Sequence, residues 1–109
     1  MKDKKSILLV EDEASLSMII KDALEEEDFQ VIMAGNGLQG IDRFYKYAPD
    51  LIIADVMMPE IDGFEMIRRI RKENKEVPVL FLSARSSTDD IVFGFELGAN
   101  DYVRKPFSR

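Results

Sequence analysis

The chain has 109 residues, of which 46% are hydrophobic and 33% are charged, and this length and composition predict a single globular domain over residues 1–109. It contains no Cys, His or Trp, which excludes disulfides, thiolate nucleophiles, Cys/His zinc sites and any mechanism that needs an imidazole from this chain. The formal net charge of −6 argues against direct nucleic-acid binding. No apolar run approaches the roughly 20 residues of a membrane span, and no signal peptide precedes the first run. We therefore expect a cytoplasmic protein that does not contact a membrane.

Three short, continuous apolar runs occupy residues 7–10, 51–54 and 79–82. Such runs are typical of strands that are buried on both faces of a parallel sheet. Two weaker strands are predicted over residues 30–34 and 101–104.

Between these runs the apolar residues recur with helical spacing. The apolar positions of the four predicted helices are Leu16, Ile19, Ile20, Ala23 and Leu24; Leu38, Ile41, Phe44 and Ala48 before Pro49; Met66, Ile67 and Ile70; and Val92, Phe93, Phe95 and Leu97 before Gly98. Strands and helices thus alternate from one end of the chain to the other. This order predicts an α/β fold with an open, doubly wound, five-stranded parallel sheet.

Polar side chains stand where the predicted strands end. Glu11 and Asp12 follow the first strand, Asp55 the third, Ser83 the fourth and Lys105 the fifth. In doubly wound sheets, ligands bind at the carboxyl ends of the strands. We therefore expect these side chains to converge on one edge of the sheet.

The three acids would place about three negative charges in a small space, and Lys105 would neutralise only one of them. The remaining charge requires a divalent cation, and oxygen ligands without His or Cys select Mg²⁺, or else Mn²⁺. An alternative is that Asp12 caps the helix that follows it. The same alternative is weaker for Asp55, because a loop containing Pro and Gly separates it from the next helix.

Four motifs resemble the receiver domain of two-component response regulators. They are Leu8-Leu9-Val10-Glu11-Asp12-Glu13, Asp55-Val56-Met57-Met58-Pro59-Glu60-Ile61-Asp62-Gly63, Ser83-Ala84-Arg85 and Gly98-Ala99-Asn100-Asp101-Tyr102-Val103-Arg104-Lys105-Pro106-Phe107. Their order and spacing match the family over nearly the whole chain. The resemblance implies the flavodoxin-like receiver fold with strand order 2-1-3-4-5.

The resemblance also implies the role of each site residue. Asp55 would be the phosphoacceptor, Lys105 would pair with the phosphoryl group, Ser83 and Tyr102 would be switch residues, and Glu11, Asp12, Asp55 and the Met57 carbonyl would hold Mg²⁺. Ser83 stands where the family more often has Thr, so the hydroxyl donor is kept and a methyl group is lost. Met57 and Arg85 are bulky residues at positions that border the path of attacking water, which predicts slow autodephosphorylation.

A phosphohistidine donor must lie on another protein, because this chain has no His, and the resemblance implies a sensor histidine kinase. The domain would then not be an ordinary enzyme but a phosphoacceptor that catalyses its own phosphotransfer. Residues 94–99 resemble the winged-helix (OmpR/PhoB-like) transcription-factor subfamily, which implies a DNA-binding output domain and transcriptional regulation. Ile91 and Asn100 depart from that subfamily, which usually has a basic residue and Asp there.

Four other interpretations are possible on the residues alone. Residues 35–40 fit the dinucleotide pattern G-x-G-x-x-G, but the chain is too short for two mononucleotide halves, and a turn with Asn36 near a helix start explains the segment. A haloacid-dehalogenase-like phosphatase needs an acid where Met57 stands. A flavin phosphate would be repelled by the acids after the first strand. A non-phosphorylated receiver-like interaction module is the main alternative.

Ser108 resembles the N-cap of a further helix, and the sequence stops at Arg109. We therefore expect a receiver truncated before its last helix. With strand order 2-1-3-4-5, right-handed crossovers place the first helix on one face of the sheet and the next three helices on the other. One helix cannot cover a five-stranded face, so we also expect marginal stability or self-association through the uncovered face.

Overall fold

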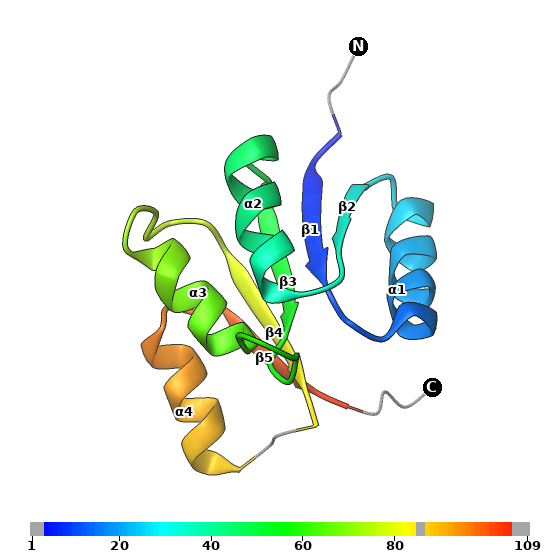
Figure 1. Ribbon diagram of the computed structural model, residues 1–109. Helices are drawn as coiled ribbons and strands as arrows, with labels where there is room; N and C mark the ends of the chain where they lie inside the picture. The colour runs from blue at the N-terminus through cyan, green and yellow to red at the C-terminus, as the bar shows by residue number, and fades with distance from the viewer. Residues whose placement is uncertain (1–3, 85–86, 106–109) are drawn as a thin grey trace.

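The computed structural model describes residues 4–84 and 87–105 (Figure 1). Its elements in chain order are β1 (Ser6–Val10), α1 (Ala14–Glu26), β2 (Gln30–Ala34), α2 (Gly37–Tyr47), β3 (Leu51–Asp55), α3 (Gly63–Arg71), β4 (Val79–Ser83), α4 (Thr88–Glu96) and β5 (Asp101–Arg104). All strand pairs are parallel, and the sheet order is β2-β1-β3-β4-β5. The predicted fold class and strand order are confirmed, and no helix follows β5 within the described residues.

β3 and β4 each extend one residue beyond their apolar runs. Asp55 lies opposite Leu82, and Ser83 lies opposite Arg104 in the parallel ladder. The polar side chains after these runs therefore belong to the strand ends themselves, where the ladder fixes their backbone.

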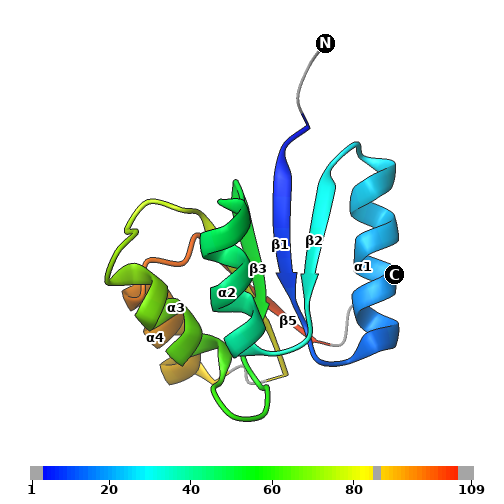
Figure 2. The same ribbon diagram turned by 45° about the horizontal axis from the view of Figure 1, so that its top comes forward.

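The helices cover the two faces of the sheet unequally (Figures 1 and 2). α1 lies on one face, over a small buried cluster of Ile7, Leu9, Ile53 and Leu82. α2, α3 and α4 lie on the other face, over a larger cluster that includes Leu8, Ile52, Met66, Ile67 and Phe81. This distribution confirms the predicted one-plus-three arrangement of helices. No helix within residues 4–84 and 87–105 was found to be long and apolar enough to cross a membrane.

In α1 and α4, the residues that face the sheet differ from those that the apolar spacing predicts. In α1, Ser17 is buried while Ile19 is 55% exposed. In α4, the buried residue is Gly94. The rings of Tyr102 and Phe81 lie beneath Gly94, and a Cβ atom there would come within 3.1 Å of the Tyr102 ring. A side chain at this position would press on both rings, so the glycine favours the close approach of α4 to the sheet.

Short polar residues begin three of the helices. The side chains of Asn36, Asp62 and Ser87 accept hydrogen bonds from the backbone N–H groups of Gln39, Glu65 and Asp90, respectively. α1 begins differently, because its N-cap is Glu13, which makes no side-chain cap. Asp12 is therefore not the cap of α1, and the capping alternative for this residue is wrong. The Asn36 cap also confirms that residues 35–40 form a turn and a helix start.

Candidate functional site

Three strands bring two acids and an amine together at one edge of the sheet. Lys105 Nζ lies 2.8 Å from Glu11 Oε1 and 3.1 Å from Asp55 Oδ2. The Glu11 and Asp55 side chains are buried, and that of Lys105 is only 16% exposed. Residues that are 94 and 50 positions apart in the sequence thus form one ion-paired cluster.

The second oxygen of each acid is held by the backbone. Glu11 Oε2 accepts a hydrogen bond from the N–H of Glu13 at 3.0 Å, and Asp55 Oδ1 accepts one from the N–H of Met57 at 3.2 Å. Each carboxylate therefore binds Lys105 with one oxygen and the backbone of its own loop with the other. This arrangement fixes the orientation of both acids.

The loop after Asp55 returns sharply to the end of β3. The N–H of Gly63 donates to the carbonyl of Val56 at 2.8 Å, and a Cβ atom on Gly63 would overlap the carbonyl oxygen of Asp55. Glu60 adopts the left-handed region with φ of 71°. Glycine at position 63 is thus a steric requirement of the loop that positions Asp55 and Met57.

Burial dominates the electrostatics of the two acids. Desolvation raises the pKa of both Glu11 and Asp55, although the hydrogen bonds from Lys105 act in the opposite direction. Burial alone would lower the pKa of Lys105, but its hydrogen bonds to the two acids outweigh that effect and raise this pKa. Lys105 therefore stays charged, and it faces two acids whose burial disfavours their ionised forms.

Asp12 completes an oxygen-rich cluster at this edge. One carboxylate oxygen each from Glu11, Asp12 and Asp55 lie within 4.8 Å of one another. Two of these residues are buried and Asp12 is exposed, so the cluster combines fixed ligands with access to water. This donor set fits Mg²⁺, which prefers carboxylate oxygens and retains several waters. The predicted convergence of the three acids is confirmed.

Ser83 and Tyr102 lie on the neighbouring strands β4 and β5. Ser83 is fully buried, and its carbonyl accepts a hydrogen bond from the N–H of Lys105 at 2.8 Å. The partly buried Tyr102 ring lies 6.1 Å from that of Phe81 and packs against Gly94 of α4. The backbone thus connects Ser83 to the lysine, and Tyr102 connects β5 to α4. Arg85 lies outside the described residues.

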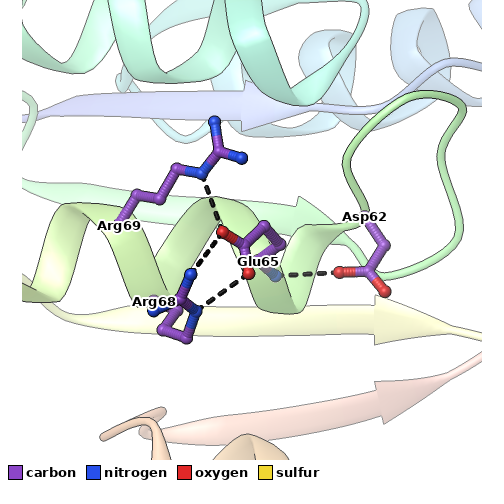
Figure 3. Close-up of polar contacts among 4 residues, drawn as sticks. All are labelled: Asp62, Glu65, Arg68 and Arg69. Carbon is purple, nitrogen blue, oxygen red and sulfur yellow. Dashed lines mark hydrogen bonds and ion pairs between the residues drawn. The ribbon is translucent and has the colours of Figure 1, made fainter.

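The sequence interpretation missed a network at the start of α3 (Figure 3). Asp62 Oδ1 accepts from the N–H of Glu65 at 2.8 Å, and the Glu65 carboxylate accepts from Arg68 at 2.7 and 2.8 Å and from Arg69 at 2.8 Å. The spacing Asp-x-x-Glu is the pattern of a helix N-terminus and could have revealed this network. It stabilises the helix that follows the loop after Asp55.

Comparisons with known proteins agree with this geometry. The family profile described as "Response regulator receiver domain" matches residues 7–109. The chain is 44% identical over 102 residues to the transcriptional regulatory protein TrcR of Mycobacterium tuberculosis, covering 94% of this chain and 40% of that protein. It is 40% identical over 104 residues to the alkaline phosphatase synthesis transcriptional regulatory protein PhoP of Bacillus subtilis, covering 95% and 43%. The chain thus spans less than half the length of these two relatives.

Solved structures show the same architecture. The non-phosphorylated HemR receiver domain from Leptospira biflexa superposes with a TM-score of 0.91 at 35% identity, covering 96% of this chain and 85% of that one. The chemotaxis protein CheY4 of Vibrio cholerae superposes with a TM-score of 0.91 at 29% identity, covering 97% and 90%.

Proposed function

Because the chain belongs to the response regulator receiver domain family, we propose that it is a signalling receiver in which Asp55 accepts a phosphoryl group. The observation that carries the proposal is the contact of Lys105 Nζ with both Glu11 and Asp55 at one buried strand edge. A buried acid that is held on one side by a lysine and on the other by a backbone N–H is fixed in place for attack.

The transfer step is a displacement at phosphorus. An oxygen of the Asp55 carboxylate forms a bond to phosphorus while the bond between phosphorus and the donor's imidazole nitrogen breaks, and the imidazole stays on the donor protein. Two anionic groups must approach each other in this step, so positioning and charge neutralisation provide most of the catalysis. Lys105 supplies one positive charge directly beside Asp55.

Glu11, Asp12 and Asp55 would hold Mg²⁺, with the Met57 carbonyl as a further ligand, and Mn²⁺ suits the same oxygen donors. When bound, the ion supplies positive charge that stabilises the phosphoryl oxygens. The buried Glu11 keeps its orientation through the N–H of Glu13, and the exposed Asp12 leaves the cluster open to an incoming donor.

Ser83 and Tyr102 would respond to the phosphoryl group on Asp55. The acyl phosphate adds charge and strong acceptor oxygens, and the Ser83 hydroxyl would donate a hydrogen bond to one of them. A movement of β4 toward Asp55 would reach α4 through Tyr102, which packs against Gly94. This route gives the receiver a surface that changes with phosphorylation.

The partners follow from the relatives. The donor would be a sensor histidine kinase, and the output would be a C-terminal DNA-binding domain that regulates transcription in the cytoplasm. This assignment is supported by the names of TrcR and PhoP, which are transcriptional regulatory proteins more than twice as long as this chain.

Phosphorylation is tested by incubating the chain with acetyl phosphate and Mg²⁺ and measuring its intact mass. We expect the addition of one phosphoryl group, its loss in Asp55→Asn, and its retention in the matched control Asp22→Asn, which changes an exposed acid on α1. A chelator should prevent the reaction. Labelling that persists in Asp55→Asn would place the nucleophile elsewhere. A folded chain that no phosphodonor modifies would favour the non-phosphorylated interaction module.

The lifetime of the phosphoryl group is a second property of this site. The Met57 side chain is 52% exposed and lies two residues after the acceptor, where it would shield the acyl phosphate from water together with Arg85. We expect slow autodephosphorylation and a faster decay in Met57→Ser, followed by intact mass after removal of the phosphodonor. An unchanged decay rate would contradict shielding by Met57.

A further inference from the structure

A groove lies at the edge of the sheet opposite to the phosphorylation site. It has a volume of about 570 Å³ and is formed by the end of α2, the turn into β3 and the connection from α3 to β4. Both connections lie at the amino-terminal ends of the strands, as Figure 1 shows. Asp50 precedes β3 and Asp55 ends it, so the strand separates the two places by about 16 Å.

The floor and walls of the groove are apolar and stiff. Phe44 is buried and Tyr45 is 53% exposed, and their rings meet edge to face with centroids 5.2 Å apart. Pro49 and Pro78 stand on the two connections, where their fixed φ angles limit backbone motion. A ligand would therefore meet a preformed apolar surface, which lowers the entropic cost of binding.

Both rims of the groove are acidic. Asp50 stands on the α2–β3 side, and Glu73 and Glu76 stand on the α3–β4 side, with no Lys or Arg among the residues that line the groove. Asp50 accepts a hydrogen bond from the N–H of Ser6. Among the residues that the structure describes, no ion pair involves Glu73 or Glu76.

The amines of two neighbouring lysines, Lys75 and Lys46, contact other groups. Lys75 Nζ donates to the carbonyl of Arg71 at 3.3 Å, and Lys46 Nζ lies 5.4 Å from the centroid of the Tyr47 ring. An apolar floor between two negative rims is complementary to a ligand that is apolar in the middle and positively charged at both ends.

We propose that this groove binds an extended segment of a partner protein in which Lys or Arg residues flank an aliphatic residue. The aliphatic side chain occupies the space between Tyr45 and the two prolines, and the cations approach the carboxylates on the two rims. An Arg beside Tyr45 also gains a cation–π contact with its ring. Acids that come from two separate connections fit such a segment better than a compact ion, which would need them to converge on one point.

This binding is independent of the phosphorylation chemistry, because no residue of the groove belongs to the Glu11, Asp55 and Lys105 cluster. The segment should bind equally well to the chain before and after treatment with acetyl phosphate, and equally well to Asp55→Asn. Failure of one proposal therefore leaves the other unaffected.

The experiment is an NMR titration of the ¹⁵N-labelled chain with the blocked peptide Arg-Leu-Arg. We expect shifts of the amide signals of Tyr45, Asn74, Glu76 and Val77, and at least a tenfold weaker affinity in the double variant Glu73→Lys/Glu76→Lys. The peptide Glu-Leu-Glu should cause no shift, and Arg-Gly-Arg should bind more weakly because it lacks the aliphatic side chain. The control Glu26→Lys/Glu27→Lys reverses two exposed acids at the end of α1 and should leave the affinity unchanged.

Three outcomes would overturn the proposal. Shifts that centre on residues 25–28 would show that the peptide follows negative charge in general. An affinity that Glu73→Lys/Glu76→Lys leaves unchanged would remove the rims from the interaction. A dimer in sedimentation that the same double variant dissociates would assign the groove to a second copy of this chain.

Discussion

α3 and α4 follow the two strands that carry Asp55 and Ser83, and each helix has nine residues. They are nevertheless held very differently. α3 buries Gly63, Phe64, Met66, Ile67 and Ile70. α4 buries Gly94, and three of its large apolar residues, Val92, Phe93 and Phe95, are 42–48% exposed.

The difference teaches how one site can both stay assembled and transmit a signal. The helix after Asp55, α3, is anchored in the larger core, which keeps the loop that positions Asp55 in place. The helix after Ser83 rests on the sheet through a glycine and the ring of Tyr102. Elements with few buried contacts need the least free energy to move, so a change at Asp55 should displace α4 more than α3.

The largest expected effect is a difference in unfolding free energy between a substitution in α3 and one in α4. Ile67→Ala removes a fully buried side chain from α3 and should lower the free energy of unfolding by about 2 to 5 kcal/mol. Val92→Ala on α4 should cost less than about 1 kcal/mol. Urea unfolding followed by circular dichroism measures both values, and similar losses for the two variants would contradict the difference in anchoring.

Gly94→Val tests the contact that brings α4 to the sheet. A side chain at position 94 would press on the Tyr102 ring, with the first added carbon 3.1 Å away, and such crowding should cost about 1 to 3 kcal/mol. The same substitution in a Tyr102→Ala background should cost less, because the obstructing ring is gone. Equal costs in the two backgrounds, measured by urea unfolding, would show that the ring does not limit the approach of α4.

Arg71 joins the end of α3 to the end of α4. Its Nε donates to the carbonyl of Leu97 at 3.0 Å, and a terminal nitrogen donates to that of Gly98 at 3.0 Å. Arg71→Met should cost about 1 kcal/mol, because water can replace hydrogen bonds near the surface. It should also speed hydrogen exchange at the Ala99 amide, whereas Lys72→Met, on an exposed neighbour, should not. Unchanged exchange in Arg71→Met would show that α4 does not depend on this connection.

The smallest effect on stability concerns Glu65 and its pH dependence. Hydrogen bonds from Arg68 and Arg69 lower the pKa of Glu65 to about 2, from an ordinary value of 4.5. The ionised carboxylate therefore stabilises the native state above pH 4.5, and this contribution is lost as the pH falls toward 2. Carbon NMR of the carboxyl group measures this pKa, and Arg68→Met should raise it. A pKa near 4.5 in the unmodified chain would show that the network in Figure 3 does not form.

The pKa shifts of the buried acids Glu11 and Asp55 have the opposite sign to that of Glu65. The pKa of both Glu11 and Asp55 is raised by burial, so the native state takes up protons at a higher pH than the unfolded chain. Their ionisation opposes folding as the pH rises through these raised values. Ionised Glu11 and Asp55 therefore lower the stability of the folded chain, whereas ionised Glu65 at the start of α3 raises it.

Much of this architecture was predictable from local patterns. Continuous apolar runs identify β1, β3 and β4, the change to helical spacing identifies the four helices, and the alternation of strands and helices predicts a parallel sheet. Because parallel strands end at one edge, the positions of Glu11, Asp55 and Lys105 just after the apolar runs or weaker strands of the sequence predict that they meet. These inferences need only the periodicity of each element and the handedness of its connections.

The tertiary structure alone decided which faces are buried and how the site is bonded. Helical spacing cannot show that Ser17 and Gly94 face the sheet while Ile19 does not, because that depends on the side chains beneath each helix. Nor can it show that Lys105 contacts Glu11 and Asp55 at once, or that burial raises the pKa of both acids. Packing and desolvation are produced by residues far apart in the chain, so they exist only once the chain has folded.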